Sequence, residues 1–338
     1  MSETVNNINE TELQQASEKF KDILYEIRKV IVGQHNMVEK TLIAILAGGH
    51  VLLEGAPGLA KTLTLKTISQ VIDAKFRRIQ FTPDLLPADL TGTRIFNQNQ
   101  GDFSIAFGPV FANLILADEI NRAPAKVQSA LLEAMQEKQV TIGNESFQLE
   151  EPFLVLATQN PIETEGTYNL PEAQLDRFMF KVLVDYPDEK EEVAVVERML
   201  GGKLPEIRAL MDCETILNYR KFANSVYVDP KLVHYIVEIV SLTRTPVKNV
   251  ALENLKSFIQ YGSSPRGSLA ITQASKALAF MRGMSYVTTE DIKSVVKECL
   301  RHRIILSYEA FAQEITQDFI IDKIVSAVEV PYPETSKI

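Results

Sequence analysis

The sequence predicts an α/β domain with a central parallel sheet, followed by a second, smaller domain made of helices. Two observations lead to this fold class. Up to Pro187, short apolar runs alternate with amphipathic segments, which is the pattern of parallel strands that helices cover on both faces. After Pro187, segments with helical periodicity dominate and no convincing strand follows. We therefore expect a domain boundary near this proline.

The strands of the sheet are predicted from short, mostly apolar runs. These runs cover residues 51–54, 76–81, 113–117, 153–157 and 178–184. Two hairpins are expected between them, because alternating segments there flank polar turns. The hairpins join 92–97 to 103–107 through the turn 98–102, and 139–142 to 146–149 through Gly143 and Asn144.

The helices are predicted from apolar residues that recur every three or four positions. Those of the first domain cover 12–30, 36–47, 62–72 and a segment that starts at Pro124, a residue suited to a first helical turn. Those of the second half cover 189–200, 230–243, 265–282, 289–303 and 315–328. Thr288 and Asp291 form a candidate capping box before the fourth of these.

These segments divide the chain into four expected parts. Residues 1–30 form an N-terminal helical segment, of which 1–9 are expected to be disordered, and 31–187 form the core that contains the sheet. Residues 188–229 are a helix with a loose connector, and 230–338 form the helical second domain.

Composition narrows the classes of function. The 338 residues carry a net charge of −9, which argues against broad, non-specific binding of nucleic acid. The two cysteines, Cys213 and Cys299, lie far apart in the sequence, so neither a disulfide framework nor a cysteine metal site is expected. The N-terminus lacks a secretory pattern, and no apolar run approaches the ~20 residues that cross a bilayer. We expect a cytoplasmic protein without direct membrane insertion.

The most informative stretch joins the first strand to the helix that follows it. A Gly/Pro loop from Gly55 ends in Lys61 and Thr62 at the start of that helix. Backbone N–H groups of such a loop bind phosphate, the lysine reaches the β- and γ-phosphates, and the threonine hydroxyl ligates Mg²⁺. The alternative is an ordinary strand-turn-helix corner. The expected contacts are Gly55, Ala56, Pro57, Gly58, Leu59, Ala60, Lys61, Thr62 and Leu63, with Ala60 in place of the usual glycine.

Two carboxylates follow the apolar strand 113–117. Asp118 and Glu119 would stand at the carboxyl edge of a parallel sheet, beside the phosphate loop. In that position Asp118 would hold the Mg²⁺ shell, and Glu119 would polarise the attacking water. Without the loop, the same pattern would indicate only a strand end with a solvated turn.

Four further polar residues are candidates for the reaction. Asn160 follows the strand 153–157 and could bind the γ-phosphate or the attacking water, although sequence chemistry alone favours an ordinary Asn-Pro turn. Arg122, Arg177 and Arg266 could offset charge that builds up on the transferring phosphoryl group. Taken singly, each arginine is better explained as a surface or salt-bridged side chain.

Together these motifs resemble AAA+ ATPases, and most closely the MoxR family. The resemblance extends from Ile31 to about Val330. The stretches that carry it are Gly55–Thr62 with Ala60, Asp84–Gly92, Asp118–Ala123, Ala157–Pro161, Glu165–Tyr168, Pro171–Phe178 and Leu300–Ile304. The resemblance implies a three-layer P-loop AAA+ domain followed by a small all-helical lid.

The resemblance also implies roles that the residues alone do not establish. Val32, Gly33 and Gln34 would lie against the adenine. Asn160 would be the sensor-1 residue, and Arg266 the sensor-2 residue of the lid. Arg177 would be the arginine finger that reaches into a neighbouring subunit, with Arg122 as an open second candidate. The hairpins at 96–107 and 139–149 would be the helix-2 insert and the pre-sensor-1 insert.

MoxR-like proteins are regarded as ATPases that remodel, mature or activate partner complexes. The resemblance therefore implies ATP and Mg²⁺, a hexameric ring, a partner with a von Willebrand factor A domain, and a protein client. A nucleotide-dependent assembly switch with little turnover and a magnesium-chelatase-like motor subunit remain alternatives. A DNA motor is disfavoured, because the chain is acidic and the turn at 98–102 carries no positive charge.

Overall fold

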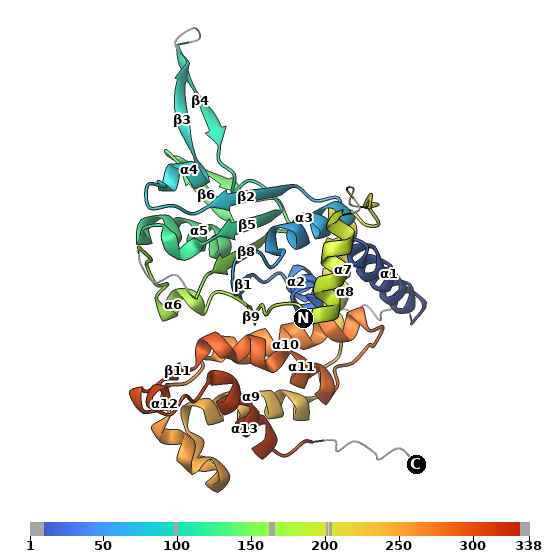
Figure 1. The fold of residues 1–338 in the computed structure, drawn as a ribbon, viewed down its shortest axis with the longest axis vertical. Coiled ribbons are helices and arrows are strands. Elements are labelled where there is room, and N and C mark those ends of the chain that lie inside the picture. The colour runs from blue at the N-terminus through green and yellow to red at the C-terminus, as the bar shows by residue number, and fades with distance from the viewer. Residues whose placement is uncertain (1–9, 98–100, 162–165, 201, 203–204, 332–338) are drawn as a thin grey trace, which may run out of the picture. The chain divides into compact units, whose positions relative to one another are not determined.

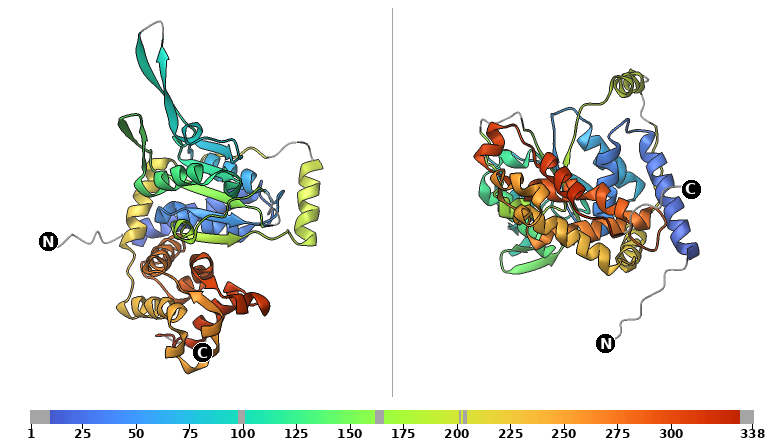
Figure 2. Two further views of the ribbon diagram at one scale, coloured as in Figure 1. Left: turned by 90° about the vertical axis from the view of Figure 1, so that its left-hand side faces the viewer. Right: turned by 90° about the horizontal axis from the view of Figure 1, so that it is seen from below.

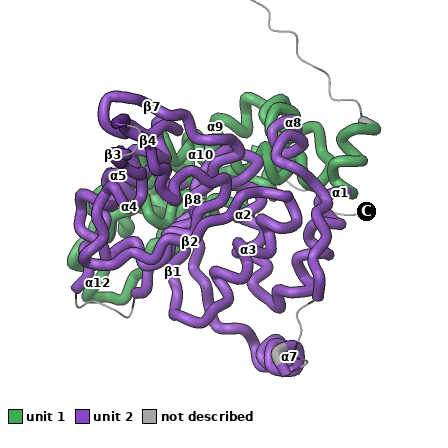
Figure 3. Tube along the Cα trace, turned by 90° about the horizontal axis from the view of Figure 1, so that it is seen from above, with its two compact units in different colours: residues 1–18, 179–181, 219–338 green, residues 19–178, 182–218 purple. Residues whose placement is uncertain are grey.

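The computed structural model describes residues 10–97, 101–161, 166–200, 202 and 205–331. The expected disorder of residues 1–9 and most of the turn at 98–102 lie outside these residues. The chain divides into two compact units (Figure 3). The sheet unit comprises Lys19–Phe178 and Val182–Asn218, and the helical unit comprises Met1–Glu18, Met179–Lys181 and Tyr219–Ile338.

The sheet unit is built on a five-stranded sheet with the order β2-β5-β8-β1-β9 (Figure 1). Its strands are β1 (Val51–Glu54), β2 (Phe76–Gln80), β5 (Leu114–Asp118), β8 (Leu154–Gln159) and β9 (Phe180–Leu183). The pairs β2–β5, β5–β8 and β1–β8 are parallel. Gln80 pairs with Asp118 in register, and Glu54 pairs with Gln159. The carboxyl ends of four strands therefore meet at one edge.

Both faces of this sheet are buried, as continuous apolar strands predict. On one face Leu52, Ile115 and Val155 join a core cluster with Val127 and Leu131 of α5. The strand residues between them, such as Leu53 and Leu116, are buried as well, and α2 and α3 lie against the sheet. The helices of the sheet unit are α2 (His35–Ala47), α3 (Lys61–Val71), α4 (Pro87–Thr91), α5 (Ala125–Glu137), α6 (Glu172–Leu175) and α7 (Glu189–Leu200). Two helices belong partly to each unit: α1 (Glu10–Arg28) begins in the helical unit and continues into the sheet unit, and α8 (Cys213–Ser225) begins in the sheet unit and continues into the helical unit.

Two hairpins leave this sheet, as the sequence predicts. The longer one pairs β3 (Gly92–Asn97) with β4 (Asp102–Phe107) and extends away from the sheet (Figures 1 and 2). The shorter one pairs β6 (Gln139–Ile142) with β7 (Glu145–Gln148). On the longer hairpin the rings of Phe96 and Phe103 are in contact, with centroids 5.1 Å apart and planes tilted by 58°.

The helical unit consists mainly of α9 (Pro230–Arg244), α10 (Pro265–Met281), α11 (Thr289–Leu300), α12 (Tyr308–Ala312) and α13 (Gln317–Ala327). The capping box before α11 is present, because Thr288 accepts from the Asp291 backbone and the Asp291 carboxylate accepts from that of Thr288. Among the described residues, none of the helices has the length and apolar content that crossing a bilayer requires.

Three details differ from the sequence-based expectations. The connector after residue 200 contains α8, whose Ile216 and Ala223 are buried. The second domain is not purely helical, because β10 (Ile259–Tyr261) pairs antiparallel with β11 (Ile305–Leu306). The helix expected over 289–303 ends at Leu300 and continues as a 3-10 turn, η4 (Arg301–Arg303). Strands of two or three residues are too short for periodicity to reveal them.

Candidate nucleotide-binding site

The loop between β1 and α3 has the backbone shape of a phosphate cradle. Gly58 has a φ of +85°, and Ala60, which precedes α3, is left-handed with a φ of 56°. The left-handed region costs an L-residue roughly 1–2 kcal/mol, so the expected departure from glycine at Ala60 is tolerated at a local cost. A Cβ atom at Gly55 would lie 2.4 Å from the carbonyl oxygen of Val184, so only glycine fits there.

Lys61 points back into this loop. Its Nζ donates a hydrogen bond to the carbonyl oxygen of Gly55, 2.5 Å away. Burial lowers the pKa of Lys61 below its ordinary value, while the charges of Asp118, Glu119 and Glu54 act in the opposite direction. The ammonium group therefore binds the loop and interacts electrostatically with the carboxylates, as expected of a phosphate-binding lysine.

Asp118 and Glu119 stand at the end of β5, and one hydroxyl connects them. Thr158 Oγ1 donates to Asp118 Oδ1 over 2.7 Å and accepts from the backbone N–H of Glu119 over 2.8 Å. Glu119 is itself left-handed, with a φ of 57°. This bridge from β8 fixes the Asp118 carboxylate and the backbone of Glu119 at the sheet edge.

Two residues of β2 also bind these carboxylates. Arg78 donates to Asp118 Oδ2 from Nε over 3.0 Å and from Nη2 over 2.6 Å. Gln80 donates to Glu119 Oε2 over 2.7 Å and accepts from Arg78 Nη2 over 2.7 Å. The sequence analysis did not identify Arg78, Gln80 or Thr158. Side chains two positions apart point to the same side of a strand, so the sequence could have shown that Arg78 and Gln80 lie on one side of the strand predicted at 76–81.

Arg122 also lies close to Glu119. It ends the 3-10 turn η1 (Ile120–Arg122), and its Nε forms an ion pair with Glu119 Oε2 of the same chain, 3.2 Å away. This pair joins two residues of one chain, and the role of Arg122 in a second subunit stays an open prediction.

Asn160 directly follows β8 and is 8% exposed. The preceding residue, Gln159, accepts a hydrogen bond from the backbone N–H of Gly55 over 3.3 Å. Asn160 therefore follows the strand residue that holds the first glycine of the loop.

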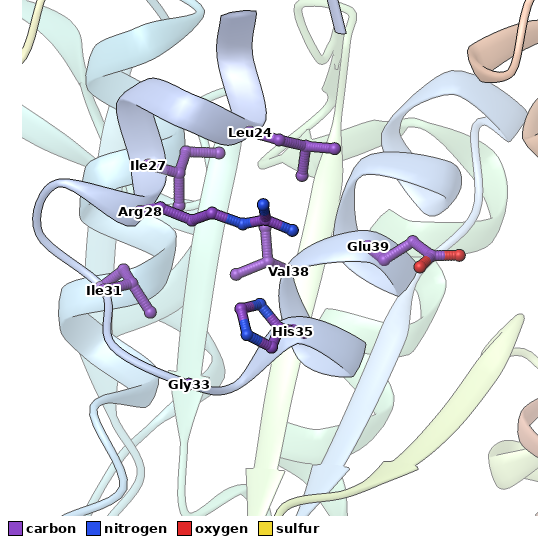
Figure 4. Close-up of a pocket in the computed structure, with 8 residues that line it drawn as sticks. All are labelled: Leu24, Ile27, Arg28, Ile31, Gly33, His35, Val38 and Glu39. Atoms are coloured by element: carbon purple, nitrogen blue, oxygen red, sulfur yellow. The ribbon is translucent and has the colours of Figure 1, made fainter. Parts of the chain in front are cut away.

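The segment Val32–Gln34 forms a sharp turn before α2. Gly33 and Gln34 have φ values of 65° and 53°, and Gln34 Nε2 donates to the carbonyl oxygen of Asp185 over 3.1 Å. The carboxylate of Glu191 lies over Gly33, 2.7 Å from where a Cβ atom would stand. Behind the turn is a small cavity of about 50 Å³ (Figure 4). Its walls are formed by Leu24, Ile27, Arg28, Ile31, Gly33, His35, Val38 and Glu39.

The two remaining candidate arginines lie in different units. Arg177 belongs to the sheet unit and follows α6, where its backbone N–H donates to the carbonyl oxygen of Gln174 over 3.2 Å. Arg266 belongs to the helical unit and lies in the first turn of α10, where Ser264 Oγ accepts from its backbone N–H over 3.1 Å.

Comparisons with known proteins agree with this geometry. Residues 50–180 match the ATPase family associated with various cellular activities (AAA), and residues 253–324 match the AAA lid domain. The chain is 47% identical to Chaperone MoxR1 of Mycobacterium tuberculosis, over 91% of this chain and 81% of that protein. The chain belongs to the MoxR family of AAA+ ATPases. The expected resemblance is thus confirmed, as is the expected fold of an AAA+ domain with a lid.

Other relatives support the MoxR assignment. Protein MoxR of Paracoccus denitrificans is 29% identical over 93% of this chain and 96% of its own length. A crystal structure of a protein from Cytophaga hutchinsonii is 48% identical, with a TM-score of 0.90 over 95% of this chain and 97% of that one. Magnesium-chelatase subunit ChlI-2 of Arabidopsis thaliana is 27% identical over only 56% of this chain and 43% of that protein. The MoxR family therefore describes more of the chain than the chelatase alternative does.

Proposed function

We propose that this protein hydrolyses ATP with Mg²⁺ at the carboxyl edge of the sheet, and that hydrolysis drives chaperone-like remodelling of a partner protein or complex. The observation that carries the proposal is the placement of Asp118 and Glu119. Thr158 holds the Asp118 carboxylate and the backbone N–H of Glu119, and both carboxylates interact electrostatically with Lys61 of the loop. Membership of the MoxR family supports the same conclusion.

The residues present fit a magnesium nucleotide. Gly58 and Ala60 give the loop the left-handed backbone that lets consecutive N–H groups converge on phosphate oxygens. Thr62, in the first turn of α3, and Asp118 supply hard oxygen ligands of the kind that Mg²⁺ prefers. The bound metal ion would offset charge on the phosphate oxygens. The base would lie against Val32–Gln34, beside the Glu191 carboxylate that covers Gly33.

The hydrolysis reaction needs a base for the attacking water, a polar side chain that binds the γ-phosphate or this water, and a cation that offsets transition-state charge. Glu119 would orient the attacking water and accept its proton, and Asn160 would bind the γ-phosphate or the same water. Arg177 would offset transition-state charge in the neighbouring subunit's site, in a ring that we propose to be hexameric, and Arg266 would contact the nucleotide from the lid. In this assignment residues 31–187 form the ATPase core, and 230–338 form the lid.

The partner is proposed from the family resemblance. A protein with a von Willebrand factor A domain would present the client to the ring, and the exposed aromatic residues of the β3–β4 hairpin, such as Phe96 and Phe103, would be available for contact. We further propose that this occurs in the cytoplasm.

A slow nucleotide-dependent switch is a second candidate, and one observation favours it. Asp118 and Glu119 already carry cationic partners from their own chain, Arg78 and Arg122. Both pairs would have to rearrange before turnover.

The two candidates differ in measured turnover. Nucleotide binding and ATP hydrolysis are measured for the wild type, Lys61→Ala and Glu119→Gln. A hydrolase predicts that Lys61→Ala loses binding, whereas Glu119→Gln keeps binding and loses turnover by about 10²–10⁴-fold. Wild-type turnover no faster than that of Glu119→Gln would reject hydrolysis and favour the switch.

A further inference from the structure

Two buried arginines of the helical unit hold the backbone that follows Arg177. Arg301 Nη1 donates to the carbonyl oxygen of Lys181 over 2.6 Å, and Arg303 Nη1 donates to that of Met179 over 3.3 Å. Met179 lies in a bend directly before β9, and Lys181 is the second residue of that strand. The two guanidinium groups on the turn η4 therefore grip residues 179–181 at both ends.

Both guanidinium groups are themselves tightly held. Arg301 also donates to Asp318 from Nε and Nη2, each over 2.7 Å, which is the bidentate geometry of strong ion pairs. Asp318 lies in the first turn of α13, where a carboxylate is favoured by the helix dipole. Arg303 donates to the carbonyl oxygen of Cys299 as well. Each arginine is only 7% exposed.

Such an arrangement is costly if its purpose is stability alone. Burying a guanidinium group requires that its lost hydration be replaced, and a buried ion pair is often no more stabilising than apolar side chains of similar volume. Two buried cations directed at a strand backbone instead fix the position of that backbone.

Arg177 lies only two peptide links from the gripped segment. Consecutive Cα atoms are 3.80 Å apart, so the Cα atoms of Arg177 and Met179 are at most about 7.6 Å apart. The residue between them, Phe178, is fully buried, and its backbone N–H donates to the carbonyl oxygen of Leu175 over 3.0 Å. The chain between Arg177 and the gripped segment therefore has little slack.

We propose that Arg301 and Arg303 are positioning residues for Arg177. By fixing residues 179–181, they set where the guanidinium group of Arg177 stands when it serves a neighbouring subunit. This inference rests on the proposed role of Arg177 in trans. It predicts that loosening the grip damages the site of the neighbour while leaving the nucleotide site of the altered subunit intact.

The first measurement separates this defect from a loss of nucleotide binding. Arg301→Lys keeps the positive charge, but a lysine cannot form the bidentate pair with Asp318 and the hydrogen bond to the Lys181 carbonyl at the same time. Asp318→Asn weakens the ion pair that holds Arg301 and leaves the arginine itself unchanged. Both variants are expected to bind ATP as the wild type does and to lose about 10²-fold in kcat, the effect of a small misplacement of a catalytic group. The control is Lys297→Gln, because Lys297 joins α11 to α13 through Asp322 and does not contact residues 179–181.

Mixed rings provide the decisive test. A subunit with Arg301→Lys should have a working site and a misplaced finger, whereas Glu119→Gln has a dead site and a working finger. Mixing the two in equal amounts should restore activity, since roughly a quarter of the interfaces in a random ring pair the working site with the working finger. Mixing Arg301→Lys with Arg177→Ala should restore nothing.

The control mixture of Arg177→Ala with Glu119→Gln tests the trans role of Arg177 separately from the positioning role of Arg301 and Arg303. If this control regains activity but Arg301→Lys with Glu119→Gln does not, the positioning role is overturned. Restoration by Arg177→Ala instead would also overturn it, because the defect would then lie in the altered subunit's own site. If the control itself stays inactive in proven mixed rings, the trans role of Arg177 fails, and the positioning inference fails with it.

Discussion

Removing Arg78 is predicted to strengthen the coupling between Mg²⁺ and nucleotide. Arg78 places two hydrogen bonds on Asp118 Oδ2, at 2.6 and 3.0 Å, and this carboxylate is a proposed metal ligand. Mg²⁺ must therefore compete with a guanidinium group for Asp118. Arg78→Ala removes the competitor and leaves the carboxylate held by Thr158.

The size of this effect follows from the exposure of the pair. The side chain of Asp118 is 18% exposed, but that of Arg78 is 49% exposed, so solvent screens the interaction. Exposed ion pairs contribute about 0.2–1 kcal/mol, and the two-bond geometry places this pair near the upper end, at about 1 kcal/mol. That energy corresponds to roughly a five-fold change in an equilibrium constant.

The assay compares the Kd of ATP in EDTA with the Kd in excess Mg²⁺. For Arg78→Ala the ratio of these two constants is expected to rise about five-fold over that of the wild type. Arg77→Ala is the matched control, because it removes the same charge one residue away, on the opposite side of the strand. A ratio that stays at the wild-type value, or that rises equally in both variants, would refute the competition for Asp118.

Three further predictions follow from the loop and the strand ends. Gly55→Ala should lose nucleotide binding and stability, because its Cβ would collide with the carbonyl oxygen of Val184. The Cβ of Gly58→Ala meets no atom within 4 Å, so this variant should lose only the roughly 1–2 kcal/mol that its left-handed backbone costs. Equal losses of stability in the two variants, measured by thermal unfolding, would contradict this prediction. Lys61→Met should abolish ATP binding yet raise the unfolding temperature at neutral pH. Burial lowers the folded-state pKa of Lys61, so the charge of this lysine opposes folding at neutral pH. The stability of the wild type therefore rises as the pH increases from that lowered pKa toward 10.5. The stability gained by Lys61→Met should shrink over the same pH range, which thermal unfolding at a series of pH values would measure. Thr158→Val should lower the free energy of unfolding by about 1–3 kcal/mol, because the Asp118 carboxylate and the backbone N–H of Glu119 lose the hydroxyl that they share. An unchanged denaturant midpoint together with unchanged turnover would show that this bridge is dispensable.

The elements that sequence analysis predicted best are those with strong local signals. The strand at 51–54 coincides with β1, and the helix at 189–200 coincides with α7. A continuous apolar run and a regular helical period leave little ambiguity for elements of this kind. The motif of the loop likewise fixed its place between β1 and α3.

The features that sequence analysis missed depend on tertiary contacts. The helix α8 is mostly polar, and burial of Ile216 and Ala223 is what gives it a packed face. Arg78 and Gln80 approach the carboxylates only because β2 pairs with β5 in register. The stretch 300–304 was singled out by the family resemblance, but the turn within it was not predicted. The hydrogen bond from Arg301 to the Lys181 carbonyl joins residues 120 positions apart, a contact that no local pattern reveals.

Steady-state ATP turnover per subunit, measured over a wide range of protein concentration, tests whether a neighbouring subunit completes the site. Specific activity is expected to rise with concentration and to reach a plateau where mass measurements show the ring, with Glu119→Gln inactive throughout. This result would mean that the active site is shared between subunits. A constant and appreciable rate at concentrations where the protein is monomeric would refute a shared site, because the site would then be complete within one chain.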